Sequence, residues 1–108
     1  MASFGEFLDA LTGELKTFIG TNFKTFSTSA TKDANAFIKK SREDLQRWTK
    51  LLADGSLTLH DFEFLLAAKK DLAEMTALKQ AGLAQVQLDR FINGVVGVII
   101  NTATKVFL

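Results

Sequence analysis

The chain has 108 residues, of which 47% are hydrophobic, and its formal net charge is +1. This length corresponds to one domain, residues 1–108. The absence of cysteine excludes disulfides and thiolate chemistry, and the balanced charge argues against nucleic acid as a partner, because phosphate binding needs clustered Lys and Arg.

An apolar residue recurs every eleven positions through the first half of the chain. The line consists of Phe4, Leu15, Phe26, Phe37 and Trp48. Eleven residues make three turns of an α-helix, so this spacing predicts a nearly straight helix over residues 3–53 with these side chains on one face. At 1.5 Å per residue such a rod would be about 77 Å long.

Two features weaken this single rod. Residues 27–31 are weak helix formers, which allows a break there. Asn22, Asp33 and Asp44 also recur at one position inside the apolar stripe. Polar residues in such a stripe either lie at its solvated edge or fix the register between packed helices by hydrogen bonding.

Residues 54–57 form the predicted turn at the midpoint of the chain. Gly55 suits the left-handed position just past a helix C-terminus. Thr58 suits the N-cap of the next helix, because its hydroxyl can accept the N–H of Asp61, and Leu57 and Phe62 have the spacing of a hydrophobic staple. These stop and start signals predict two antiparallel helices.

Residues 58–104 predict a second helix with two apolar ridges. The first ridge contains Phe62, Leu66, Ala73, Ala77, Ala84, Leu88, Phe91, Val95 and Ile99, and the second contains Leu65, Leu72, Met75, Leu83 and Val86. Two ridges require two neighbours, so a hairpin alone would leave one uncovered. The run after Arg90 is apolar nearly all round, which favours a buried helix, although its β-branched residues are also compatible with a strand. Gly82, Gly94 and Gly97 are expected where another backbone comes close.

The chain has few residues suited to catalysis. His60 is the only histidine and is expected to face solvent near a helix start. The central turn matches the second half of an EF-hand loop, but Lys50 and Leu52 stand where calcium needs oxygen ligands. No phosphate-binding glycine motif occurs, and a single histidine without cysteine is too little for a metal cage. We therefore expect no catalytic residue, metal, cofactor or small-molecule substrate.

These features together predict an all-α fold, in which a long antiparallel hairpin (helix 3–53, turn 54–57, helix 58–104) is completed by oligomerisation into a helical bundle or array. The expected function is non-enzymatic and structural, namely self-assembly of a homo-oligomer through apolar helix faces. The residues expected at the interface are Phe4, Leu15, Phe26, Phe37, Trp48, Phe62, Leu65, Leu72, Met75, Leu83, Val86, Phe91, Val95 and Ile99.

The alternative function is association with a lipid or membrane surface, as an oligomeric pore or coat. The Phe stripe and the apolar run 91–108 would enter the interface, with Lys side chains on the opposite face. The start of the chain lacks the pattern of a signal peptide, and the longest charge-free run, residues 91–104, is shorter than the roughly 20 residues that span a bilayer. A cytoplasmic location is therefore favoured.

Overall fold

The computed structural model describes residues 2–108, of which helices form the great majority and in which no strand occurs. The prediction of an all-α fold is therefore confirmed. The elements follow in the order α1 (Phe4–Asn22), η1 (Lys24–Phe26), α2 (Ser27–Ala53), α3 (Leu59–Ala68), η2 (Lys69–Leu72), α4 (Thr76–Gln80) and α5 (Gln85–Phe107), where η marks a short 3₁₀ turn.

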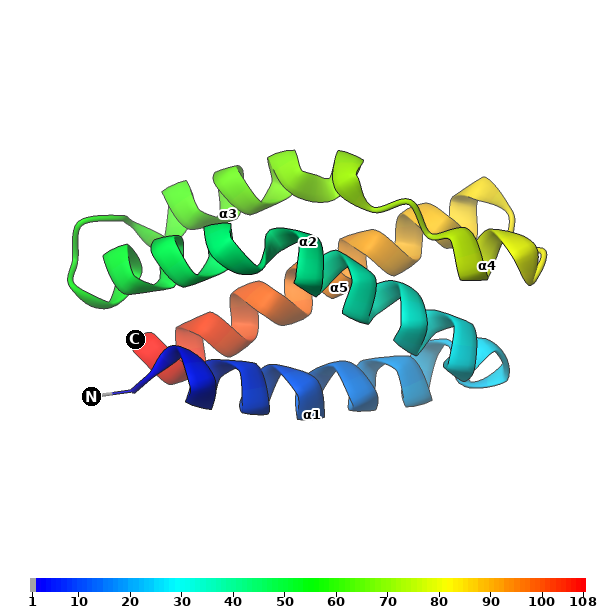
Figure 1. Ribbon diagram of the computed structural model, residues 1–108, viewed down its shortest axis with the longest axis horizontal. Coiled ribbons are helices and arrows are strands. Elements are labelled where there is room, and N and C mark those ends of the chain that lie inside the picture. The colour runs from blue at the N-terminus through cyan, green and yellow to red at the C-terminus, as the bar shows by residue number, and fades with distance from the viewer. Residues whose placement is uncertain (1) are drawn as a thin grey trace.

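The chain runs along the length of the molecule four times (Figure 1). α1 and α2 are antiparallel, α3 and α4 together form the third pass, and α5 returns so that both termini lie at the same end. The longest dimension is 42 Å. The expected long hairpin is thus folded once more on itself, and the third pass is interrupted.

The continuous helix expected over residues 3–53 is wrong. α1 ends at Asn22, and the chain reverses through Phe23, whose φ of −133° and ψ of 37° are not helical, and η1. The ring of Phe23 packs edge-on against the ring of Phe91 at 5.3 Å between centroids. The reversal brings both halves of the eleven-residue line onto one core, which a straight rod could not do. It lies just before the weak helix formers of residues 27–31, which form the first turn of α2.

The continuous helix expected over residues 58–104 is also wrong, because the chain leaves the helix twice. Ala73 is extended and Met75 takes a left-handed conformation with φ of 50°. Gly82, with φ of 95°, then ends α4, and the N–H of Leu83 donates to the carbonyl of Leu78 at 3.2 Å. This is the hydrogen-bond pattern of a Schellman cap. Gly82 therefore serves a turn and not the close backbone approach that we expected.

The central turn forms as predicted. Gly55 has φ of 84°, and the N–H of Ser56 donates to the carbonyl of Leu51 at 2.9 Å, as in the cap at Gly82. The hydroxyl of Thr58 accepts the N–H of Asp61 at 3.0 Å, which starts α3. The hydroxyl and N–H of Ser56 hold the pKa of the Asp54 carboxyl below its usual value.

The run after Arg90 is the buried helix α5, so the alternative of a strand is excluded. α5 packs against α1 along most of its length. Their buried side chains are Phe7, Leu11, Leu15 and Ile19 of α1, and Leu88, Phe91, Ile92, Val95, Val96, Ile99, Thr102 and Ala103 of α5. At Gly94, a Cβ atom would lie 2.2 Å from the ring of Phe18, whereas at Gly97 it would meet nothing within 4 Å. The backbone approach expected at these glycines is therefore wrong, because a side chain comes close at Gly94 and nothing does at Gly97.

Candidate functional site

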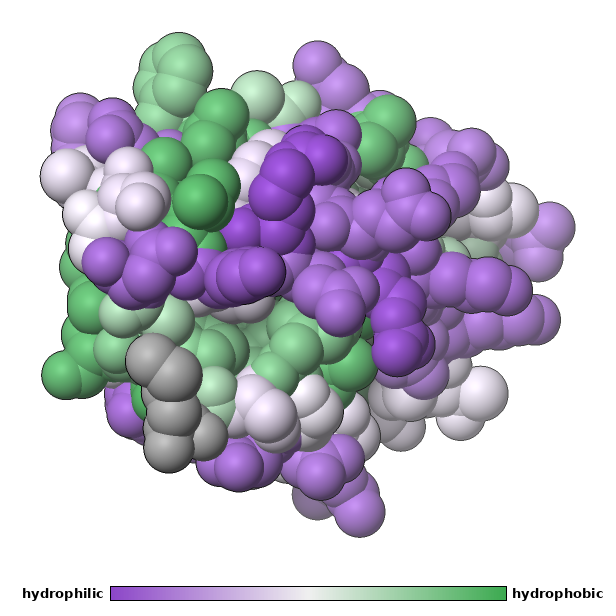
Figure 2. All heavy atoms as spheres, turned by 60° about the vertical axis from the view of Figure 1, so that its left-hand side comes forward, coloured by the Kyte–Doolittle hydropathy of each residue, from purple (hydrophilic) through white to green (hydrophobic). Residues whose placement is uncertain are grey.

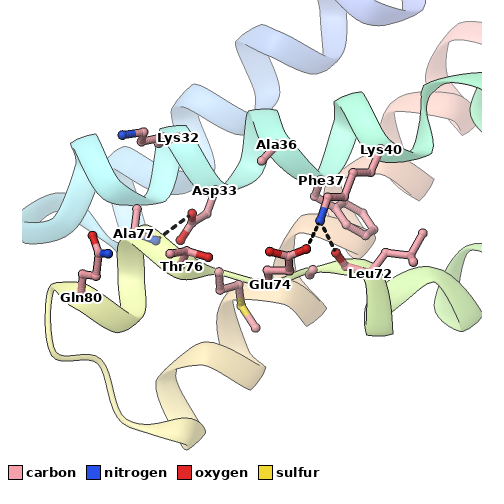
Figure 3. Close-up of a pocket in the computed structure, with 12 residues that line it drawn as sticks. Lys32, Asp33, Ala36, Phe37, Lys40, Leu72, Glu74, Thr76, Ala77 and Gln80 are labelled. Atoms are coloured by element: carbon pink, nitrogen blue, oxygen red, sulfur yellow. Dashed lines mark hydrogen bonds and ion pairs between the residues drawn. The ribbon is translucent and has the colours of Figure 1, made fainter.

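A cavity of about 380 Å³ lies between α2 and the irregular segment that joins η2 to α4 (Figure 3). Phe37, Leu72 and Met75 give it an apolar part, and Lys32 and Lys40 stand at its edge from α2. The close-up shows Lys40 reaching across to the segment, while Lys32 points away from it. The cavity therefore marks the place where the interrupted third pass is attached to α2.

Asp33 of α2 caps α4 from across the cavity. Its carboxylate accepts the N–H of Ala77 at 3.1 Å and the N–H of Leu78 at 2.8 Å, and the residue is only 8% exposed. The N-cap position of α4 is Met75, which cannot supply a side-chain acceptor. Asp33 thus takes over the role that an N-cap residue normally has, because the first N–H groups of a helix have no intrahelical partner.

Lys40 of α2 fastens the extended part of the same segment. Its ammonium donates to the carbonyl of Leu72 at 3.5 Å and forms an ion pair with Glu74. The hydrogen bond from Lys40 holds the pKa of the Glu74 carboxyl below its usual value. Both side chains are largely exposed, so water screens this pair more than it screens the contacts of Asp33.

Asp44 attaches η2 to α2 one eleven-residue step beyond Asp33. Its carboxylate lies 2.5 Å from the ammonium of Lys69 and 2.7 Å from the guanidinium of Arg47. The hydrogen bond from Lys69 is the main cause that lowers the pKa of Asp44. The Lys69 ammonium also lies 5.8 Å from the centre of the Trp48 ring, at the distance of a cation–π contact.

The three polar residues of the stripe therefore have different roles. Asp33 and Asp44 fix the position of the third pass against α2 by hydrogen bonding, as expected for polar residues that set the register between packed helices. Asn22 instead donates its side-chain amide to the carbonyl of Phe18 at 3.1 Å, within its own helix. Polar positions at one repeat of the sequence are thus register contacts only where a neighbouring element comes within reach.

The cavity offers no arrangement of a nucleophile beside a base. Both carboxylate oxygens of Asp33 accept backbone N–H groups, and Glu74 is paired with Lys40. His60 lies exposed on α3 and does not line the cavity. Within residues 2–108, no group of three or more His, Cys, Asp or Glu side chains is placed to hold a metal ion. Asp33 and Lys40 therefore hold the segment between η2 and α4 against α2.

The outer side of α3 carries exposed apolar side chains. What we call the α3 outer face consists of the exposed residues His60, Phe64, Ala67 and Ala68 of α3 and Asp71 and Leu72 of η2. Phe64 is 73% exposed and Leu72 is 40% exposed. Figure 2 shows apolar side chains gathered over α3, at the top of this side of the molecule. The opposite side of the helix carries Phe62 and Leu66, which are fully buried, so α3 has apolar side chains on its inner and on its outer side.

No family model, curated protein or solved structure matches this chain. We therefore infer its function from its own residues. Within the described residues, no helix has the length and apolar character needed to cross a bilayer.

Most of the residues predicted for the interface lie in the core of a single chain. Leu15, Phe37, Trp48, Phe62, Leu83, Phe91, Val95 and Ile99 are buried, and Phe4, Phe26, Leu65 and Met75 are half-buried. Only Leu72 and Val86 are exposed, and they lie apart, on η2 and on the first turn of α5. The structure thus gathers the predicted set into one core instead of presenting it as a face.

Phe64 and Ala67 of the α3 outer face are not among the interface residues predicted from the sequence. Both lie outside the two predicted apolar ridges. In this part of the chain, the first ridge contains Phe62 and Leu66, and the second contains Leu65 and Leu72. The signal that could have identified them is that residues 62–68, Phe-Glu-Phe-Leu-Leu-Ala-Ala, contain one charged residue and leave no polar side for a helix.

Proposed function

We propose that this chain is a non-enzymatic interaction protein that self-associates through the α3 outer face. The observation that carries this proposal is the exposure of Phe64. Of the ten phenylalanines, nine are buried or half-buried, and Phe64 alone is exposed. Burial of such a ring contributes about 1.5–3 kcal/mol, and an exposed ring with apolar neighbours is typical of a site of association.

The size of the assembly that this surface supports is smaller than the sequence led us to expect. The oligomer was expected to cover a second apolar ridge, but Phe91, Val95 and Ile99 of the first ridge and Leu83 of the second are already buried within one chain. The α3 outer face is one side of a helix of 10 residues and the short turn that follows it. It therefore supports a weak dimer more than a large helical array.

Association with a lipid surface remains the second proposal, on a narrower basis. Phe64 and Leu72 could enter a membrane interface as they stand. The Phe stripe and the C-terminal run cannot do so without opening the bundle, because most of their apolar side chains lie in the core. A membrane role of those residues would thus have to overcome the stability of the fold.

Sedimentation of the purified chain over a range of concentrations tests self-association. We expect a reversible dimer by about 1 mM, a limit that corresponds to an association free energy of about −4 kcal/mol. Phe64→Ser should give a monomer. The matched control is Val86→Ser, which replaces a side chain of similar exposure, 70%, at the start of α5 and should leave the dimer unchanged.

Adding vesicles of anionic phospholipid separates the two proposals. A dimer that ignores vesicles supports self-association and counts against the lipid role. A chain that is monomeric at about 1 mM but floats with the vesicles, and loses this binding in Phe64→Ser, would contradict self-association and support the lipid role.

A further inference from the structure

We infer that two copies of this chain pair antiparallel, about a two-fold axis, through the α3 outer face, with Phe64 of each copy against Ala67 of the other. This inference rests on the proposed function and adds the partner surface and its orientation. It is carried by the order of side chains along the face.

The first observation is a stripe of regular spacing. His60, Phe64, Ala67 and Asp71 follow one another at steps of four, three and four residues, and all four are exposed. Residues at these steps follow one line along an α-helix. Here His60, Phe64 and Ala67 lie on α3, which ends at Ala68, and Asp71 lies on η2, the 3₁₀ turn that directly continues it. The line is symmetric about a point between Leu65 and Leu66, and each half contains one apolar residue near the centre and one polar residue at the end.

The second observation is the size of the central side chains. In an antiparallel pair centred on that point, the large ring of Phe64 faces the methyl group of Ala67 from the second copy, and this happens twice. A parallel pair would instead set Phe64 on Phe64 and leave a gap between the two Ala67 side chains. Large residues opposite small ones pack more densely than large opposite large with small opposite small.

The third observation is charge. The antiparallel order places His60 beside Asp71 of the second copy at both ends of the stripe, and brings Glu63 near Lys70 of the second copy on one flank. The parallel order would bring Asp71 beside Asp71 of the second copy. Like charges placed together destabilise a helix pair, so the charges favour the antiparallel order.

The fold holds this face in place before any partner arrives. Phe62 and Leu66 anchor the inner side of α3 in the core, and Lys69, two residues before the end of the stripe, is bound to Asp44 of α2. A face whose backbone is already fixed loses little conformational entropy on binding, which favours association through a small area.

Engineered cysteines test the orientation, because the chain contains none of its own. In the antiparallel pair, Ala67→Cys lies near the two-fold axis, so its two copies should form a disulfide in glutathione disulfide, with reduced glutathione as the other product. The two copies of His60→Cys would be separated by eleven residues, about 16 Å, too far for a disulfide, whose Cα atoms are at most about 7 Å apart. An equal mixture of His60→Cys and Asp71→Cys should form the covalent heterodimer.

Each outcome of this experiment decides something. Covalent dimers of Ala67→Cys and of the mixture, with none from His60→Cys alone, support the inference. Adding Phe64→Ser to Ala67→Cys should then weaken pairing about tenfold or more, as removal of an aromatic anchor does. Covalent dimers of His60→Cys alone indicate the parallel order and overturn it.

A dimer in sedimentation that none of these cysteines traps would place the interface on another face. That result overturns the inference but leaves self-association standing. A chain that stays monomeric at about 1 mM without any cross-link contradicts both.

Discussion

α5 and the third pass of the chain come from the same predicted helix, yet only α5 is continuous. α5 runs through 23 residues and packs its apolar side along α1. The third pass is divided into α3, η2 and α4, and it is held to α2 by Asp33, Lys40 and Asp44. The contact of α5 with α1 is mainly apolar along its length. The contact of the third pass with α2 combines buried apolar side chains with hydrogen bonds and ion pairs.

This difference shows what an interrupted helix needs from its neighbours. Each interruption frees backbone N–H and C=O groups, and a buried group without a partner costs about 1–3 kcal/mol. The N–H groups of Ala77 and Leu78 donate to the carboxylate of Asp33, and the carbonyl of Leu72 accepts a hydrogen bond from the ammonium of Lys40. α5 requires no such help, since its internal backbone groups are paired along the helix.

The largest expected effect concerns the apolar anchor of the third pass. Phe62→Ala should lower the free energy of unfolding by about 3–5 kcal/mol, because its side chain is fully buried. Phe64→Ala, two residues further along the same helix, should change it by less than about 0.5 kcal/mol, because that side chain is exposed. Denaturant titration measures both. Equal losses in the two variants would show that α3 is rotated from the position described here.

The next effect tests how tightly α5 fits α1. Gly94→Ala would place a Cβ atom 2.2 Å from the ring of Phe18, so we expect a loss of about 1–3 kcal/mol from overpacking. Gly97→Ala in the same helix meets nothing within 4 Å and should gain up to about 1 kcal/mol from helix propensity. Thermal unfolding of both variants gives opposite shifts of Tm. A gain at both positions would mean that Phe18 moves aside without cost.

The sequence predicts the helical class, the central turn and the buried character of α5, because these depend on local signals. Gly55, Thr58 and Asp61 act within a few residues of one another, and the apolar period is visible without knowledge of the partner. The same logic applied to Gly82, with Lys79 in the turn before it, would have located the second reversal.

The break at Phe23 lies a few residues before the position that the weak helix formers of residues 27–31 indicate, and the break at residues 73–75 has no comparable local signal. Lys69, Lys70 and Leu72 are good helix formers, and the helix yields there because α2 supplies partners for the freed backbone. The candidate surface was missed for a related reason. Phe64 differs from the other nine phenylalanines only in its exposure, which is known once the fold shows that the other nine are buried or half-buried.

A smaller effect is expected from the polar contacts of α2, among which the buried cap at Asp33 is compared with the exposed ion pair of Lys40 and Glu74. Asp33→Ala removes the acceptor of two N–H groups, one of them buried, so we expect a loss of about 1–3 kcal/mol. Lys40→Met breaks the exposed pair with Glu74 and should cost less than about 1 kcal/mol. Hydrogen exchange locates the effect, since the amides of Ala77 and Leu78 should exchange faster in Asp33→Ala only. Unchanged exchange at both amides would contradict the cap.

The smallest expected effect is the pH dependence of the stability that the ion pairs of Asp44 contribute. Lys69 and Arg47 lower the pKa of this carboxyl in the folded chain below its ordinary value of 3.8, so its contribution to stability is fully present above that value and is lost as the pH falls through the lower, folded pKa. Urea titrations at successive pH values should therefore show a decline in acid that is shallower in Asp44→Asn. Asp9→Asn is the matched control, because Asp9 is an exposed carboxylate of α1 with no hydrogen bond or ion pair among residues 2–108. If the acid decline of Asp44→Asn matched that of the control, the contact of η2 with α2 would rest on Trp48 and its apolar neighbours, and the two sides of the molecule would differ less than their geometry indicates.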